Sequence, residues 1–119
     1  MPQSSSKFIR TIVSGVPELV REVYLSEETD RHIREHHPTE YKRFSDIVQA
    51  VEKPTRVHKS KVHPTAVVFV NDRSTSTDGD PLRVPVKVYS DGTGIISTAH
   101  FSSAATQGPL LWGLVADEQ

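Results

Sequence analysis

The sequence predicts an α+β domain in which two N-terminal helices pack on a twisted antiparallel β-sheet of about four strands. Two observations carry this prediction. Between Ser26 and Pro54, apolar residues recur at helical spacing and capping residues stand before them. After Pro54 the pattern changes to continuous apolar runs and to strict alternation, which are typical of strands. The chain has 119 residues, enough for one domain with a modest core.

The two helices are expected in direct succession. The first begins at Ser26, an N-cap residue type, and two glutamates follow in its first turn, where the helix dipole favours negative charge. It runs to about His36 or His37, because the proline that comes next disfavours continuation. Thr39 caps the second helix, which ends before Pro54. Its apolar residues lie on one face: Tyr41, Phe44, Ile47, Val48 and Val51.

Strands are expected on both sides of the helices. Residues 22–25 form a short strand, and residues 7–13 form a first strand or an extended arm. Beyond the helices, residues 56–63 alternate apolar and basic side chains, and residues 66–70 are a continuous apolar run typical of a central strand. Residues 71–81, rich in Ser, Thr, Asp and Gly, are expected to form a loop.

A turn at Asp91-Gly92 joins residues 82–89 and 94–101 into a hairpin. A two-residue turn places Arg83 opposite His100 and gives the hairpin one polar and one apolar face. The polar face carries Arg83, Lys87, Thr98 and His100, with Pro85 and Ile96 among them, and the apolar face carries Leu82, Val84, Val88, Ile95, Ala99 and Phe101.

Three parts of the chain are distinguished. Residues 1–19 are expected to be a flexible leader or arm, residues 20–103 a single α+β domain, and residues 104–119 a C-terminal extension. The extension contains an apolar cluster, which is either a closing strand or a segment that docks on a groove or a partner. The cluster consists of Leu110, Leu111, Trp112, Leu114 and Val115.

Composition narrows the function classes. The absence of cysteine excludes disulfide scaffolds, thiolate metal sites and cysteine nucleophiles. No apolar run approaches the ~20 residues that span a bilayer, and no secretory signal is visible, so we expect a cytoplasmic location and no membrane partner. The 14 basic and 15 acidic residues give a net charge of −1, so binding to nucleic acid would depend on a local patch. The six histidines are the residues best suited to proton transfer near neutral pH.

Two clusters of histidines and cations have competing interpretations. The string His32-x-x-Glu35-His36 is the inverted zinc-peptidase motif, but the further carboxylate on a downstream helix that this class requires is missing. The alternative is a solvated helix end, where cations interact well with the dipole. The basic stretch 56–63, which includes Lys59, fits either a phosphate backbone or a protected edge strand.

The chemistry of RNA cleavage without a metal fits the remaining residues. Thr98 and His100 alternate along a strand, which puts them about 7 Å apart on one face. Cleavage requires a base for the 2′-hydroxyl, an acid for the leaving 5′-oxygen and cations for the phosphate. Two histidines with lysine or arginine supply all three. His37 or His100 would be the base and the other the acid.

The order of these segments resembles a known nuclease fold. His32-Ile33 and His37-Pro38 precede an amphipathic helix, a basic strand, an apolar strand and the string IISTAH at 95–100. This order is similar to the barnase–EndoU–colicin E5/D–RelE-like fold, and within it to small phage-associated domains. The resemblance covers about residues 22–101. It implies a metal-independent, toxin-like ribonuclease that needs no cofactor.

The same resemblance implies a site and partners. His32 and His37 match the helix histidines of the family, and Thr98 and His100 match the polar residues of its last core strand. Lys59 and Arg83 would contact phosphate, together with Lys87 on the same face as Arg83. RNA would be the substrate, and an antitoxin, an immunity protein or a second copy would bind the C-terminal tail. The alternative is a non-catalytic relative that acts as a binding module or as a toxin–antitoxin or phage accessory protein.

Overall fold

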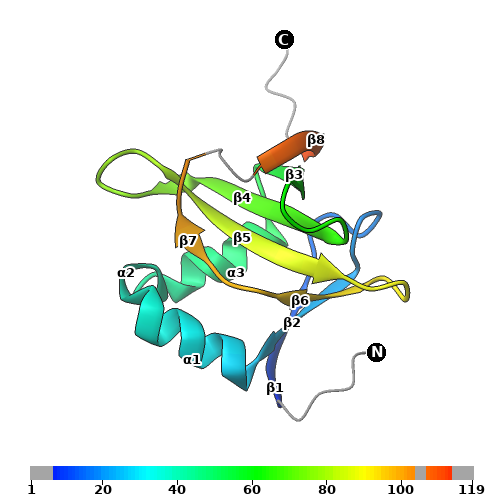
Figure 1. The fold of residues 1–119 in the computed structure, drawn as a ribbon, viewed down its shortest axis with the longest axis horizontal. Coiled ribbons are helices and arrows are strands. Elements are labelled where there is room, and N and C mark those ends of the chain that lie inside the picture. Colours follow the sequence, from blue (N-terminus) through cyan, green and yellow to red (C-terminus); the bar gives the residue numbers. More distant parts are fainter. Residues whose placement is uncertain (1–6, 104–106, 114–119) are drawn as a thin grey trace.

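The computed structural model describes residues 7–103 and 107–113. Two strands precede the helices, and the other strands follow them (Figure 1). In chain order the elements are β1 (Phe8–Val13), β2 (Glu22–Ser26), α1 (Glu27–His36), α2 (Pro38–Tyr41), α3 (Phe44–Glu52), β3 (Arg56–Ser60), β4 (Ala66–Thr75), β5 (Pro81–Val88), β6 (Thr93–Ile96), β7 (His100–Phe101) and β8 (Gln107–Gly113).

The predicted α+β class is confirmed, but its details are wrong. Within the described residues there are three helices and a mixed sheet of eight strands, in the order β1-β2-β6-β5-β4-β3-β8, with β7 paired to β5. The helices are central in the chain, because β1 and β2 form an antiparallel pair before them. The sheet is mixed because β2 runs parallel to β6, a pairing between segments far apart in the sequence.

Helix α1 begins and ends where the sequence predicts. The Ser26 hydroxyl accepts a hydrogen bond from the backbone N–H of Thr29 at 3.1 Å, which satisfies one free donor of the first turn. At the other end the N–H of His37 donates to the carbonyl of Ile33 at 2.8 Å. His37 therefore lies directly after the last helical residue, and its ring can leave the helix surface.

The second predicted helix is divided into α2 and α3. Arg43 leaves the helical conformation, with φ −109° and ψ 44°, and its guanidinium donates to the Thr75 carbonyl at 2.7 Å. It also lies over the Phe101 ring, at 5.1 Å from the centroid. These contacts to the sheet hold Arg43 outside the helix. His37, not Thr39, is the N-cap of α2.

The core lies between the helices and one face of the sheet. Helix α3 packs on β4 and β5, α1 lies against β2, and their buried side chains form one cluster with those of the sheet; Figure 1 shows α3 crossing behind the strands. The central members are Ile33, Ile47, Val51, Val57, Phe69 and Val84. The other face of β3, β4 and β5 is turned away from the helices. We call it the outer face.

The hairpin loop is one residue longer than predicted. The Tyr89 N–H donates to the Thr93 carbonyl at 2.8 Å, which leaves residues 90–92 as the loop, and Gly92 adopts the positive φ of 88° that a three-residue loop requires. Lys87 consequently faces Ile95. In β6 the two isoleucines therefore lie on the faces opposite to those expected. Ile96, expected on the polar face, is buried in the core, and Ile95, expected on the apolar face, lies on the side of Lys87.

A bulge between β6 and β7 restores the predicted register. Val86 and Arg83 of β5 are three residues apart, whereas the residues that pair with them, Ile96 of β6 and His100 of β7, are four residues apart. One extra residue is therefore accommodated at 97–99. Arg83 then faces His100, as the sequence predicts. Bulges of this kind re-aim side chains and are common beside active sites.

Two further segments differ from or refine the predictions. The expected loop at 71–81 is shorter, because β4 continues to Thr75. Polar side chains of this part of β4 form hydrogen bonds to α3. The Asn71 amide donates to the Asp46 carbonyl at 3.2 Å, and the Ser74 hydroxyl donates to the Asp46 carboxylate at 2.9 Å. In the C-terminal extension, β8 pairs with β3 as a closing strand. Residues 1–6, and Leu114 and Val115 of the predicted apolar cluster, lie outside the described residues.

None of the helices in the described part of the chain is long and apolar enough to cross a membrane.

Candidate active site

Two histidines predicted to act together lie side by side. His37 occupies the junction between α1 and α2, and His100 is the first residue of β7. Their ring centroids are 6.1 Å apart, and both residues are half-buried. Imidazoles from separate parts of the chain therefore meet at one edge of the sheet, where each can exchange a proton with a group placed between or beside them.

Glu40 holds His37 and His100 next to each other. β7 has β5 on one side, and on its other side the Phe101 N–H donates to the Glu40 carboxylate at 2.8 Å. Glu40 is only 8% exposed. Its carboxylate thus takes the place of a neighbouring strand and attaches α2, and with it His37, to β7. No pattern in the sequence pointed to this role.

His32 extends the histidine cluster away from the sheet. Its ring lies 5.5 Å from the ring of His37 and 5.0 Å from that of His36, centroid to centroid. His32 and His36 are exposed on α1. Among the described residues, no group of three or more His, Asp or Glu is arranged to hold a metal ion, so the zinc-peptidase interpretation of His32, Glu35 and His36 gains no support.

The surroundings of His100 favour its neutral form. Burial lowers the pKa of its imidazole, and the charges of His37 and Arg83 act in the same direction, while Glu40 opposes them. At neutral pH a ring of this kind is free to accept a proton. Arg83 itself is 2% exposed and donates through Nε to the Ser102 carbonyl at 2.9 Å. It acts on His100 by its charge from within the protein, not as an exposed phosphate contact.

Thr98 lies in the bulge, next to His100 but not in the regular ladder. The bulge is held by its neighbour, since the Ser97 N–H donates to the Pro85 carbonyl at 2.9 Å. In the described part of the chain, the buried hydroxyls of Thr98 and Ser102 have no hydrogen-bond partner.

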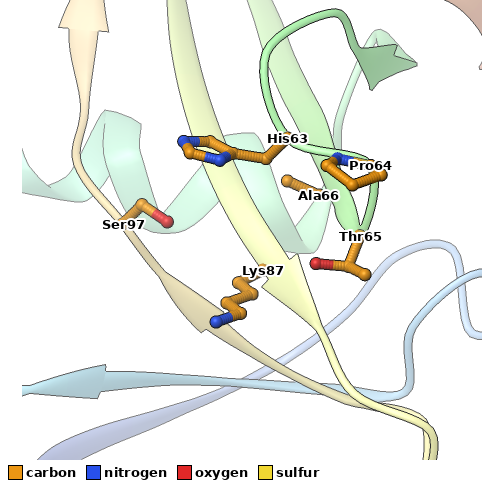
Figure 2. Close-up of a pocket in the computed structure, with 6 residues that line it drawn as sticks. All are labelled: His63, Pro64, Thr65, Ala66, Lys87 and Ser97. Carbon is orange, nitrogen blue, oxygen red and sulfur yellow. The ribbon is translucent and has the colours of Figure 1, made fainter.

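A groove leads from His100 across the outer face. A pocket of about 180 Å³ lies between His100 and Thr98 on one side and Val62 and His63 on the other. It shares His63, Ala66 and Ser97 with a second hollow of about 330 Å³. Figure 2 shows this second hollow, with the imidazole of His63 on one side and the hydroxyl of Ser97 and the ammonium of Lys87 on the other.

The two predicted lysines lie on different faces. Lys87 is exposed on the outer face and lines the groove. Lys59 pairs with Val67, and its ammonium donates to the Pro64 carbonyl at 2.8 Å. Because side chains alternate along a strand, Lys59 is on the opposite face from His58 and is not part of the groove. From the basic stretch, His63 reaches the groove instead.

A network of polar side chains from β3 and β4 supports the outer face. The Arg56 guanidinium makes two bonds of 2.8 Å to the Asp72 carboxylate and holds the pKa of that carboxyl at about 2. Arg56 also contacts Nε2 of His58 at 3.1 Å, while Nδ1 of His58 donates to the Gly108 carbonyl at 2.9 Å. The neutral His58 ring therefore connects β3 to β8.

Comparison with known protein families, with curated proteins and with solved structures finds no match to this chain.

Proposed function

We propose that this protein is a metal-independent ribonuclease that cleaves RNA by transesterification, of the nuclease fold that its sequence resembles. The observation that supports this most directly is the pairing of His37 with His100 at 6.1 Å, centroid to centroid. The pair stands beside a groove that presents Lys87 and His63. One imidazole for each proton transfer meets the acid–base needs of the reaction, and Lys87 can hold the phosphate backbone further along the groove.

We assign the two roles from the environment of His100. His100, whose pKa is lowered chiefly by burial, removes the proton from the ribose 2′-hydroxyl. The 2′-oxygen bonds to phosphorus while the bond from phosphorus to the 5′-oxygen breaks. Protonated His37 donates its proton to the leaving 5′-oxygen. The products are a 2′,3′-cyclic phosphate and a 5′-hydroxyl, and each histidine ends in the protonation state in which the other began.

Other residues orient or stabilise this pair. Glu40 positions His37 against His100, and Lys87 contacts phosphate along the groove. His32 flanks His37, with the two ring centroids 5.5 Å apart.

The test is cleavage of end-labelled RNA in the presence of EDTA. His37→Ala and His100→Ala should each lower the rate by about 10²–10⁴, the usual contribution of a general acid or base. His36→Ala is the matched control, because His36 is the exposed histidine that ends α1 immediately before His37, and the variant should retain activity. The proposal is wrong if purified, folded protein cuts no RNA, or if the His37 and His100 variants cut as fast as the wild type.

A second candidate function is a non-catalytic binding module. It is favoured by one observation: Leu110 and Leu111 of β8 are 58% and 43% exposed, although both belong to a sheet strand. Apolar side chains in such a place fit a partner protein, such as an antitoxin or immunity protein, or a second copy. Light scattering on a Leu110→Ser, Leu111→Ser variant tests this: an unchanged mass and unchanged binding partners would contradict it.

A further inference from the structure

The helices cover only part of their face of the sheet. Figure 1 shows them toward one end, while the start of β4 and the end of β5 extend beyond them. A hollow of about 400 Å³, which we call the end hollow, lies at that uncovered end. Its walls include Leu19, Val67, Val88, Tyr89 and Leu111. Val67 and Val88 are each two residues from a core residue of the same strand, so they point to the helix side.

The end hollow suits an apolar side chain and not an ionic ligand. Among the described residues that line it, Lys59 is the one charged side chain. Its ammonium donates to the Pro64 carbonyl at 2.8 Å, so this charge is held within the protein. What the hollow offers to another molecule is therefore mainly an apolar surface, of the kind that marks contacts between proteins.

The strand that borders the end hollow is the last strand of the sheet. In the described part of the chain, β8 pairs with β3 on one side and with no strand on the other. A strand edge of this kind carries backbone N–H and C=O groups that can pair with a further strand. Leu110 and Leu111 of β8 are 58% and 43% exposed, and Leu111 lines the hollow. β8 therefore offers both backbone groups and apolar side chains to a partner.

The absence of charge from β8 allows it to pair with its own copy. Proteins commonly protect an exposed strand edge with charged side chains, and β1, at the other edge of the sheet, carries Arg10. By contrast, residues 92–116 contain no Asp, Glu, Lys or Arg, although these types make up 24% of the chain. Like charges that lie opposite each other destabilise a strand pair, and β8 brings none to a second β8.

The geometry of β8 favours a second copy over the chain's own C-terminal tail. The strand ends at Gly113, which pairs with Arg56, and Arg56 begins β3, whereas the hollow lies near Lys59 toward the other end of β3. The chain thus leaves β8 on the side away from the hollow. A two-fold axis pairs two β8 strands antiparallel and places one residue opposite its own copy. With Leu111 at this position, the two leucine side chains cover each other beside the two end hollows.

We infer that β8 is a dimer interface, in which β8 of a second copy pairs antiparallel beside it, centred on Leu111, and the sheet continues through both copies. The dimer leaves the candidate active site free. His100 lies on β7, which pairs with β5, and both β4 and β3 stand between β5 and β8. The inference does not depend on RNA cleavage, because the association of two chains can be measured without it.

The experiment is sedimentation equilibrium of the full chain over a range of concentrations. The wild type should reach twice the 13.3 kDa of one chain. Leu111→Asp should weaken the association at least about 100-fold, because the interface would bury a carboxylate without a partner. Val13→Asp is the matched control: Val13 is 68% exposed on β1, the other edge strand, and the variant should dimerise like the wild type. Circular dichroism shows that both variants are folded.

A single introduced cysteine tests the register, since the chain has none of its own. Residues directly opposite each other in an antiparallel pair have Cα atoms about 4.5–5.5 Å apart, which is within the range of a disulfide. Leu111→Cys should therefore give a disulfide-linked dimer on mild oxidation, and Val13→Cys should stay unlinked. Gels run with and without reducing agent measure both.

Four results would overturn the inference. A chain that stays monomeric at every concentration would leave the β8 edge to a different protein. An assembly larger than a dimer would indicate a head-to-tail contact, such as β8 against β1 of the next copy. A dimer that Leu111→Asp leaves intact would be held together elsewhere. A dimer in which Leu111→Cys does not link would have another register or another interface.

Discussion

Replacing Glu40 should both destabilise the protein and change the titration of His100. The Glu40 carboxylate accepts the Phe101 N–H at 2.8 Å and is 8% exposed. Glu40→Ala removes the acceptor and leaves a shielded N–H without its partner, which costs about 1.5–3 kcal/mol for a bond to a charged group. Lost packing of the side-chain methylenes adds about 0.8 kcal/mol for each one that is buried. We expect a total loss of about 3 kcal/mol in the free energy of unfolding.

The conservative variant separates the hydrogen bond from the charge. Glu40→Gln keeps a carbonyl oxygen for the Phe101 N–H, so it should cost only about 1 kcal/mol. Both variants remove the negative charge that raises the pKa of His100, so in both the His100 pKa should fall further. Urea denaturation measures the first effect, and NMR titration of the His100 ring measures the second.

Glu52→Ala provides the baseline, because Glu52 is an exposed glutamate at the end of α3. Its replacement should change stability by no more than about 0.5 kcal/mol. If Glu40→Ala is no less stable than Glu52→Ala, or if the His100 pKa does not move in either Glu40 variant, then Glu40 does not hold His37 and His100 together.

Three further predictions concern the rest of the fold. Burial lowers the pKa of His58 in the folded protein, whereas the same histidine in the unfolded chain has a pKa near 6.5. Below about pH 6.5 the unfolded chain therefore binds more protons, and the free energy of unfolding should fall as the pH drops. His58→Gln should make this pH dependence weaker when stability is measured by urea denaturation. The bond to Arg56 holds the pKa of Asp72 at about 2, below its ordinary value of 3.8, so the ionised carboxylate contributes stability. Because its side chain is 42% exposed, Asp72→Asn should cost about 1 kcal/mol at pH 7, and this cost should disappear as the pH falls from about 5 to about 1. Gly92→Ala should lower the melting temperature more than Gly79→Ala. Both glycines have a positive φ, which strains any other residue. An added methyl at Gly92 would also lie 2.7 Å from the Arg21 side chain, whereas a methyl at Gly79 would meet open space.

The elements that depend on local signals were predictable. Ser26 begins α1 as its side-chain oxygen predicts, and the apolar alternation of 82–89 appears as β5. The pairing of Arg83 with His100 also followed from the hairpin, although by way of two compensating differences. The three-residue loop shifted the register by one, and the bulge at 97–99 shifted it back.

The elements that depend on distant contacts were not predictable. The parallel pairing of β2 with β6 joins Glu22 to Thr93, and nothing near either residue indicates it. The break between α2 and α3 follows from the contacts of Arg43 with Thr75 and Phe101, residues from other parts of the chain. A sequence shows helical spacing, but it does not show which residue a sheet will draw out of the helix.

The residues of the candidate site show the same difference between local signals and distant contacts. His37 and His100 could be selected because histidines are few and their chemistry is specific. Glu40 could not, because its importance arises from a backbone N–H of β7 that happens to lack a strand beside it. Lys59 was assigned to the phosphate from its neighbours in sequence, yet strand alternation places it on the other face.

The nature of the cut ends tests the central proposal most directly. A short RNA of defined sequence, incubated with the protein in EDTA and examined by ³¹P NMR, should give 2′,3′-cyclic phosphate and 5′-hydroxyl ends, and His100→Ala should give neither at a comparable rate. Ends that carry a 5′-phosphate, or cyclic ends formed equally fast by His100→Ala, would show that the imidazole pair of His37 and His100 is not what cleaves the RNA.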